Sequence, residues 1–396
     1  MRILIRKIKA WLAYKPQYGE NKFIFMCGRL VNVLLTYFYD SYFFKWKRKE
    51  FDLDSNKMSL SQLIDLIETA IFHSITNKEV SGGRTYEHIA CLQHSKISQD
   101  LLANKTFAKA LAMRYKCTKD EKYKRLLIEC TEYILKHKLS NGIYRCEQPM
   151  GLAQDEGPVT AGVIQVLCET YDITKDERYL DEAIVTADQA MKLLFDPKYG
   201  YLHTLGYNIQ TTNINSSFAY SFAMIYRITG NEKWKKASLD ALGYVLNMQK
   251  EDGQFYYSSI DKSVYFSLYH YMVLNAIMMI SKGCNIEIEN YDKTINSGFM
   301  YGMKLLNDDN TILEPCREGV HSDIHSCTRA IIFYILYGKS GIAKQIQGQL
   351  CKFVSNGKVR LIITKKMKVT DGKYWYRKTR QLIDTYCDLV TIDYLS

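Results

Sequence analysis

Apolar positions along the chain recur in long blocks rather than every second residue, which predicts helices and not a sheet. Residues 217–228 are apolar nearly all round, as a helix buried on both sides must be, whereas residues 232–249 carry a Lys and Asp face typical of an outer helix. The two kinds of block follow one another along most of the chain. We therefore expect an all-α protein built from pairs of one inner and one outer helix.

The connection inside each pair recurs in the sequence. Thr118-Lys-Asp-Glu-Lys-Tyr123 returns as Thr174-Lys-Asp-Glu-Arg-Tyr179 and as Thr229-Gly-Asn-Glu-Lys-Trp234, 56 and then 55 residues later. Asp or Asn before Glu is favourable N-cap chemistry for the second helix. Each unit then closes on a glycine, at positions 142, 200 and 253. The repeat predicts a helical-hairpin architecture.

Extending this pattern over the chain gives six inner and six outer helices. Inner helices are expected at 102–116, 159–173, 215–228, 265–280, 323–337 and 379–395, and outer helices at 59–76, 121–138, 177–194, 232–249, 289–306 and 341–354. Six units with an apolar inner layer favour a closed (α/α)6 toroid over an open solenoid, since the last inner helix can close the ring beside the first. Residues 358–363 and 373–376 predict a short β-hairpin before the last helix.

Residues 1–56 form a separate basic and aromatic segment ahead of a toroid domain at 57–396. Residues 1–50 carry 11 Lys and Arg against 3 acids, whereas the remainder carries 42 against 39. Because the body of the chain is nearly neutral, a nucleic-acid partner is not expected. Residues 23–44 are apolar and aromatic but interrupted by Arg29, Asn32 and Asp40, which argues against a membrane span. A helix packed on the ring is favoured over a helix lying on a membrane face.

The eleven cysteines form no CxxC pair and lie singly among apolar residues, which indicates reduced thiols in a core. The start of the chain lacks the apolar stretch and cleavage site of a signal peptide. Both observations favour a cytoplasmic protein, with contact to the inner face of the plasma membrane through residues 1–50 as a further hypothesis. The 31 tyrosines suit a wide polar cleft that stacks on sugars, although AT-rich coding bias explains them equally well.

Residues with chemical potential gather in the loops that lead into the inner helices. In a toroid these loops emerge at one end, where the helix N-termini also favour anionic groups. Histidines 203, 270, 321 and 325 lie at this end, whereas His73 and His137 lie on outer helices. We expect the loops before residues 215, 265 and 323 to form the working end of the ring.

His321-x-Asp323-x-His325 has the residue types of a zinc site, but at this spacing the carboxylate falls on another helix face. Asp323 as a helix cap, with His325 pointing into the cleft, is the favoured interpretation, and no metal is expected. Glu147, Asp155 and Glu156 offer carboxylates for glycoside cleavage. No Gly-rich phosphate loop, GxSxG elbow or Cys/His dyad is present, so no cofactor is predicted.

Two segments resemble a known group of proteins. Tyr269-His270-Tyr271-Met-Val-Leu is similar to the (F/Y)H-x-G-(Y/F)-x-L segment of toroid proteins encoded with bacterial capsule and exopolysaccharide genes, and Asp323-Ile324-His325-Ser326 resembles their D-I-H-S segment. Arg329 stands where that segment has glutamine. Residues 372–377 resemble their late aromatic hairpin, and the resemblance covers roughly residues 60–396.

That group looks like the wider toroid proteins that include glucuronyl C5-epimerases and uronate polysaccharide lyases. The resemblance implies removal of the proton at C5 of a uronate. Such chemistry needs a cation or amide on the carboxylate, a base, and an acid. The candidates are Arg317 or Asn215 for the carboxylate, His270 or Tyr220 for the base, and His325 or Tyr257 for the acid.

The remaining substrate-binding candidates come from the same loops and from the late aromatic segment. They are His321, Asp323, Asn213, Tyr269, Glu156, Tyr376 and Arg377. The expected partner is an oligo- or polysaccharide or its lipid-linked precursor. Two alternatives remain open: a glycoside hydrolase of the same fold that uses Glu156 and Asp323, and a non-catalytic glycan-binding or assembly subunit.

Overall fold

The computed structural model describes residues 50–53, 57–76, 101–146, 155–205, 209–259, 266–315, 317, 319–370 and 378–396. Within these ranges twelve α-helices alternate between an inner and an outer layer. The inner helices are α4 (Leu101–Thr118), α6 (Glu156–Thr174), α8 (Thr212–Thr229), α10 (Ser267–Met278), α12 (Ile324–Leu336) and α14 (Lys378–Leu395). The outer helices are α3 (Leu60–Thr76), α5 (Glu121–Leu135), α7 (Glu177–Leu193), α9 (Glu232–Leu246), α11 (Tyr291–Lys304) and α13 (Ser340–Gln347).

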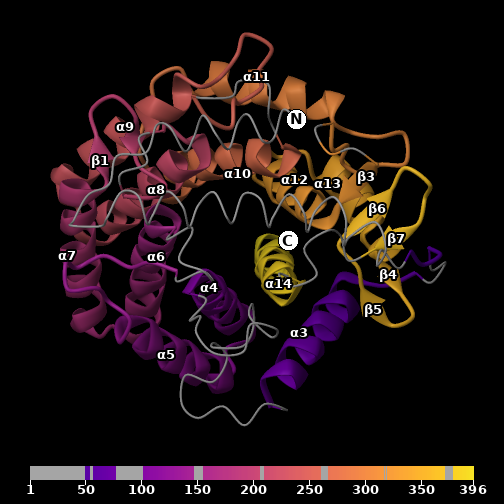
Figure 1. Ribbon diagram of the computed structural model, residues 1–396, viewed down its shortest axis with the longest axis horizontal. Coiled ribbons are helices and arrows are strands. Elements are labelled where there is room, and N and C mark those ends of the chain that lie inside the picture. The colour runs from indigo at the N-terminus through magenta and orange to yellow at the C-terminus, as the bar shows by residue number, and fades with distance from the viewer. Residues whose placement is uncertain are drawn as a thin grey trace, which may run out of the picture.

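The inner helices form a closed ring (Figure 1). Each packs against the next in chain order, and α14 returns to pack against α4 and α3. The predicted (α/α)6 toroid is confirmed, and the expected helices lie within a few residues of the observed ones apart from the last outer helix. A π-helix, Met279–Gly283, continues α10.

Burial separates the two layers as the sequence pattern predicts. In α6, fourteen of nineteen residues are buried, whereas in the outer helix α9 only six of fifteen are buried. An inner helix packs against two neighbours in the ring and one outer helix, so it needs an apolar surface nearly all round. An outer helix turns one face to solvent and tolerates the Lys and Asp seen there.

The three repeated connections fold identically. Thr118, Thr174 and Thr229 each donate a hydroxyl hydrogen bond to the carbonyl four residues earlier and accept one from the backbone amide two residues later. Asp120, Asp176 and Asn231 then cap α5, α7 and α9 through a side-chain oxygen. The N-cap prediction is therefore confirmed at all three copies.

The ring is fastened where its first and last helices meet. Glu68 on α3 accepts hydrogen bonds from Arg114 Nε of α4 at 3.1 Å and from the Tyr123 hydroxyl of α5 at 2.7 Å. The hydroxyl of Tyr386 on α14 also donates to Glu68. One carboxylate thus joins four helices, and we refer to these residues as the Glu68 latch.

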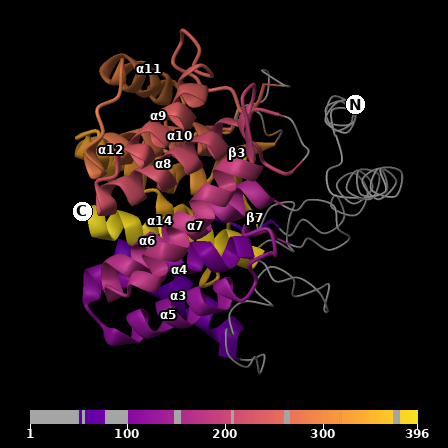
Figure 2. The ribbon, with the colours of Figure 1, turned by 90° about the vertical axis from the view of Figure 1, so that its left-hand side faces the viewer.

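Short antiparallel strands decorate the ring. A two-stranded ribbon joins β1 (Phe195–Asp196) to β2 (Gly200–Tyr201), and another joins β4 (Val354–Ser355) to β5 (Lys358–Val359). A three-stranded sheet has the order β3 (Val320–Asp323), β6 (Ile362–Thr364) and β7 (Val369–Thr370). Strands β3 and β7 lie on the side of the ring opposite the C-terminus (Figure 2).

The predicted hairpin near the C-terminus is present, but its pairing was wrong. The expected strand at 358–363 divides into β5 and β6, and β6 pairs with β7 and β3. Residues 373–376, its expected partner, lie outside the described residues. The expected helix at 341–354 ends early because a 3-10 helix, Leu350–Phe353, follows α13 and Val354 enters the ribbon with Val359.

Residues 1–49 of the predicted N-terminal segment at 1–56 lie outside the described residues, and the hypothesis of membrane contact rests on them. Within the described part, no helix is both long and apolar enough to cross a membrane. Phe51 pairs with Val369 of β7, and the Arg360 guanidinium lies 3.9 Å from the centre of the Phe51 ring. The stretch 50–53 therefore contacts the small sheet.

Eight of the eleven cysteines fall within the described residues, and all eight are free thiols. Six of them are buried among apolar side chains, at positions 130, 146, 168, 284, 327 and 387. For these six, the prediction of core-packed thiols is confirmed.

Candidate active site

A cavity of about 420 Å³ lies at the centre of the ring and is lined by all six inner helices. It takes in Asp155, His203 and Tyr257, which belong to the loops ahead of α6, α8 and α10, and extends along the helices to Met224 and Thr391. The loops that the sequence singled out therefore contribute some of the residues that line the cavity, and the inner helices contribute most of them.

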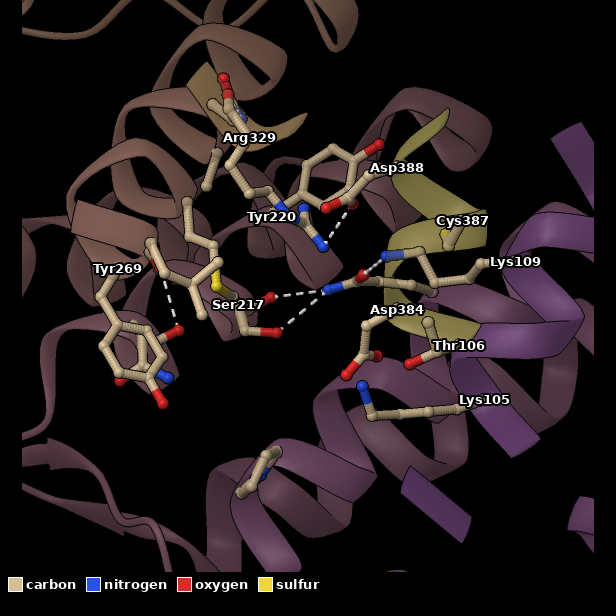
Figure 3. A pocket seen from close by; sticks show the side chains of 18 of the residues that line it. Lys105, Thr106, Lys109, Ser217, Tyr220, Tyr269, Arg329, Asp384, Cys387 and Asp388 are labelled. Carbon is tan, nitrogen blue, oxygen red and sulfur yellow. Dashed lines mark hydrogen bonds and ion pairs between the residues drawn. The ribbon is translucent and has the colours of Figure 1, made fainter. Parts of the chain in front are cut away.

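The side of the cavity formed by α4, α6 and α8 holds a connected polar network (Figure 3). Lys109 on α4 donates from Nζ to Gln165 Oε1 of α6 at 2.7 Å. Gln165 Nε2 lies 3.1 Å from the carbonyl oxygen of Ser217 and 3.0 Å from Ser221 Oγ, both on α8. Because that carbonyl only accepts, the network fixes the amide with its oxygen toward Lys109.

A second group of charges crosses from α12 to α14 (Figure 3). Arg329 Nη2 lies 2.8 Å from Asp388 Oδ1, and Thr328 donates to the other carboxylate oxygen at 2.8 Å. Burial raises the pKa of Asp388, while Arg329 opposes this shift. On α6, Glu169 forms an ion pair with Lys116 at the far end of α4.

Lys105 and Asp384 extend toward one another from α4 and α14 (Figure 3). The stem of Lys105 passes directly over Gly162 of α6: a Cβ at that position would lie 2.1 Å from Lys105 Cδ. Glycine at 162 leaves room for the Lys105 stem in this position, and a larger residue would make that flexible side chain shift.

Aromatic rings gather where the cavity meets the loop ahead of α10. The rings of Tyr257 and Tyr269 lie 4.9 Å apart between centroids at 31°, and Phe266 packs edge-on against both. Such a pair presents flat apolar faces beside polar hydroxyls. We refer to Tyr257 and Tyr269 as the tyrosine pair.

Three side chains of the cavity wall hold a buried polar atom with no hydrogen-bond partner among the described residues. They are Asn213 Oδ1, Asn275 Oδ1 and Arg329 Nε. A buried polar atom without a partner costs about 1–3 kcal/mol. Unsatisfied groups of this kind mark a place where water or a ligand completes the bonding.

His325 lines the cavity at the start of α12, as expected, and Asp323 caps that helix by accepting from the His325 backbone amide at 2.9 Å. The His325 ring lies between two acceptors: its Nδ1 is 3.1 Å from Asp323 Oδ1, and its Nε2 is 2.8 Å from the Gln381 carbonyl oxygen. Burial alone would lower the pKa of His325, but the bond to Asp323 and nearby carboxylates raise it to about 9. His325 is therefore a cation at neutral pH.

Carboxylates and a histidine meet at the cavity edge. His203 Nδ1 lies 3.5 Å from Asp155 Oδ1, and both residues line the cavity. The adjacent Glu156 is buried beneath the loop ahead of α8, where it accepts from the Leu205 amide, and it does not line the cavity. Burial raises the pKa of Glu156 to about 7.

Five of the predicted site residues meet in the cavity, and six described ones do not. Those in the cavity are Tyr220, Tyr257, Tyr269, Asn213 and His325, and those outside its lining are His270, Arg317, Asp323, His321, Asn215 and Glu156. Tyr376, Arg377 and Glu147 lie outside the described residues. Of the carboxylates named for the glycoside-hydrolase alternative, Glu156 and Asp323 do not line the cavity, whereas Asp155 does.

His270 turns away from the cavity. Its Nε2 lies 3.1 Å from the Gly298 carbonyl of α11, and its ring packs against Phe255 and Tyr301. Burial lowers the pKa of His270 to about 4, so the imidazole is neutral. Without access to the cavity, it fills the space between α10 and α11 rather than meeting a substrate there.

The other outlying candidates have structural partners. Asn215 accepts from the Tyr201 amide at 2.8 Å and donates to the Thr211 carbonyl at 3.1 Å, which fixes the loop that enters α8. His321 lies 3.2 Å from the Thr311 hydroxyl. Arg317 forms an ion pair with Asp323 and holds the pKa of that buried carboxyl well below its usual range.

Sequence reasoning missed most charged residues of the cavity, namely Lys105, Lys109, Glu169, Arg329, Asp384 and Asp388, and the neutral Gln165. All lie within inner helices and not in loops. A signal was available, because a charged residue on a helix that is otherwise buried all round needs a polar cavity or a partner. Across the described residues, no cluster of three or more His, Cys, Asp and Glu side chains has the arrangement of a metal site.

The fold is shared with several solved structures of carbohydrate-active enzymes. Cellobiose 2-epimerase from Bacillus thermoamylovorans superposes with a TM-score of 0.63 at 12% identity, over 84% of this chain and 98% of that one. A polysaccharide lyase gives 0.60 at 12% identity, over 84% and 97%. A family 76 glycoside hydrolase from Bacteroides thetaiotaomicron gives 0.60 at 12% identity, over 85% and 78%.

These likenesses establish the toroid fold. No protein-family model and no curated protein matches the sequence.

Proposed function

We propose that this protein binds an acidic glycan in the central cavity and acts on a uronate residue by epimerase or lyase chemistry. The observation that carries the proposal is that one cavity holds both the tyrosine pair and two cationic side chains, Lys105 and Arg329. Flat aromatic faces suit a sugar ring, and cations suit its carboxylate.

Arg329 is the best candidate to bind the uronate carboxylate. One of its terminal nitrogens pairs with Asp388, whereas its Nε has no partner among the described residues. A guanidinium has five N–H donors, so the pair with Asp388 leaves others for a ligand. This role replaces Arg317 and Asn215, which the sequence suggested and which do not line the cavity.

Removing the C5 proton places negative charge on the carboxyl group, and a fixed cation beside it stabilises that charge. Tyr220, Tyr257 and His325 remain candidates for proton donation because all three line the cavity. Burial raises the pKa of Tyr220 well above its ordinary value, so its phenol carries the proton at neutral pH.

The proposal extends to the biological process in which the protein acts. The D-I-H-S segment, on which the likeness to capsule and exopolysaccharide toroids rests, places His325 in the cavity and caps α12 with Asp323. We propose a role in bacterial surface polysaccharide synthesis, on a polymer or a lipid-linked precursor, at the cytoplasmic face of the membrane.

The test uses oligosaccharides of glucuronate, galacturonate and mannuronate, with carboxyl-reduced versions as neutral controls. The protein is incubated with each in D2O; C5 deuterium uptake reports epimerisation, ultraviolet absorbance of the unsaturated product reports elimination, and calorimetry reports binding. We expect one uronate series to bind and react. Equal binding of the reduced, neutral oligosaccharides would contradict an acidic substrate, and binding without either reaction would leave a glycan-binding protein.

Arg329→Met tests the carboxylate contact in the same assays. Loss of a charged hydrogen bond of about 1.5–3 kcal/mol weakens uronate binding roughly ten- to hundredfold. Binding of the reduced oligosaccharide should change far less. Lys236→Met, on the exposed face of α9, is the matched control and should leave both unchanged.

A further inference from the structure

We infer that Lys109 is the base that removes the uronate C5 proton, an inference that rests on the proposed function. No loop carries this residue. It lies on the inner helix α4, and its amine reaches the cavity wall between α6 and α14.

The first argument is the bonding of the amine. In the part of the chain that the structure describes, Lys109 Nζ has one hydrogen-bond partner, the neutral Gln165 oxygen at 2.7 Å, and forms no ion pair. The nearby carboxylates are already engaged, Glu169 with Lys116 and Asp388 with Arg329. An amine held only by a neutral amide retains a lone pair for proton transfer once it is deprotonated.

The second argument is the electrostatic environment. Cys387 and Asp388 of α14, Glu169 of α6 and Arg329 of α12 face Lys109. Burial, assisted by the positive charge of Arg329, lowers the pKa of Lys109, and the acidic neighbours oppose this only in part. A lysine becomes a general base near neutral pH only when its pKa is lowered in this way.

The third argument is the position of Lys109 relative to the proposed carboxylate site. Arg329 is close enough to influence the Lys109 amine, and both line the same cavity. C5 of a uronate is bonded directly to its carboxyl carbon. A carboxylate held by Arg329 therefore brings the C5 proton to the neighbourhood of Lys109.

The proposed step balances as follows. The Lys109 lone pair takes the C5 proton, the C5–H bond breaks, and its electron pair spreads into the carboxyl group beside Arg329. In elimination, that pair forms the C4–C5 double bond, the C4–O4 bond breaks, and O4 takes a proton from the Tyr220 phenol. The proton on Lys109 then returns to the phenolate through water. In epimerisation, C5 instead takes the Tyr220 proton on its opposite face, and the proton on Lys109 again returns to the phenolate through water.

The decisive variants separate charge from basicity. Lys109→Arg keeps the positive charge and a donor toward Gln165, but a guanidinium does not deprotonate in proteins. We expect Lys109→Arg and Lys109→Met to lose at least a hundredfold in C5 exchange rate. Uronate binding by Lys109→Arg should stay within a few-fold of wild type. Exchange at the wild-type rate in Lys109→Arg would overturn the inference and leave the proposed function standing.

Gln165→Glu provides a readout that a merely structural lysine would not move. A carboxylate at this position favours the charged amine and raises the pKa of Lys109. Since the base must be neutral, the rising limb of the pH–rate profile should shift to higher pH. An unshifted limb in an active Gln165→Glu variant would count against Lys109.

A third measurement does not require the glycan. Reductive methylation of the intact wild-type protein with formaldehyde near neutral pH, followed by peptide mass spectrometry, reports which lysines are neutral. Lys109 should be modified faster than Lys236, and Gln165→Glu should slow it. Slow modification of Lys109 overturns its role as base, whereas failure of every uronate to bind overturns the proposed function and this inference together.

Discussion

Left-handed residues stand at the same place in the three repeated connections. Lys119, Lys175 and Gly230 have φ of 58°, 60° and 65°. The third copy uses glycine, which adopts this conformation without strain, whereas the first two place a lysine there. The repeat has therefore kept the backbone geometry and not the residue best suited to it.

Lys175→Gly should stabilise the protein by about 1 kcal/mol, since it relieves a left-handed side chain at an exposed position. Gly230→Lys is the reciprocal control and should destabilise by a similar amount, because open space around Gly230 excludes a steric explanation. Thermal or denaturant unfolding measures both. A destabilised Lys175→Gly variant would show that the lysine side chain contributes more than its backbone costs.

A pH effect belongs to His325. The pKa of His325 rises from 6.5 to about 9 on folding. Its contribution to the free energy of unfolding is therefore complete below pH 6.5 and is lost as the pH rises through 9. The loss is on the order of 3 kcal/mol. Burial raises the pKa of Glu156 from 4.5 to about 7. The unfolding free energy therefore falls through Glu156 between about pH 4.5 and pH 7, below the range in which His325 acts.

We therefore expect the unfolding free energy of the wild type to fall between about pH 7 and pH 9. His325→Gln should be less stable at pH 7 and should show a shallower decline. Chemical denaturation at a series of pH values measures the slope. Equal slopes in the two proteins would mean that His325 is not a cation in the folded state.

At the scale of elements, the helix starts divide into capped and uncapped. The caps of α5, α7 and α9 use side-chain oxygens, whereas Thr211 and Phe266 supply no side-chain cap to the inner helices α8 and α10. These three outer helices thus satisfy one of their first amides locally, whereas the outer helices α11 and α13 have no side-chain cap. The starts of α8 and α10 lie instead at the loop end of the cavity, where a positive helix terminus favours an anionic ligand.

Asn231→Ala should cost about 1 kcal/mol of stability, because the Lys233 amide loses its side-chain acceptor. Lys339→Ala is the control, since Lys339 occupies the N-cap of α13 without a side-chain bond. Hydrogen exchange at the first turn of each helix locates the effect. Unchanged protection in α9 would mean that Asn231 does not act through the cap.

Helix faces explain which residues could be predicted. Successive residues on a helix point about 100° apart. Tyr269 faces the cavity while its neighbour His270 faces α11. The sequence marks both as polar residues at a promising loop, but only the packing of α10 decides which one turns inward. For the same reason, Lys109 and Arg329 were not predicted as cavity residues, because the sequence indicates only that their helices are buried.

At the scale of the molecule, the toroid itself was predictable because period, burial and N-cap chemistry all indicate one architecture. The small sheet was less so. Its strands are two to four residues long, and β3 pairs with β6 across about 40 positions, for example Val320 with Thr364. Such short strands carry little pattern, and tertiary contacts determine their partners.

Closure of the ring depends on the Glu68 latch. Glu68→Ala should destabilise by about 3 kcal/mol, because Arg114 would lose its closest carboxylate and two tyrosine hydroxyls would lose their acceptor. Tyr386→Phe removes one donor and should cost about 1 kcal/mol. Denaturant unfolding gives the magnitudes. A Glu68→Ala loss no larger than that of Tyr386→Phe would argue against a shared latch.

The same closure has a consequence during synthesis on the ribosome. The helical hairpins from α4 to α13 can form as each emerges, because their partners are near in sequence. The wall containing Asp384 and Asp388, and the donor from Tyr386 to Glu68, arrive only with α14. Until that helix is translated, the nascent chain is an open crescent whose binding site is missing one side. Maturation of the site therefore waits until α14 has been translated and has packed against α4.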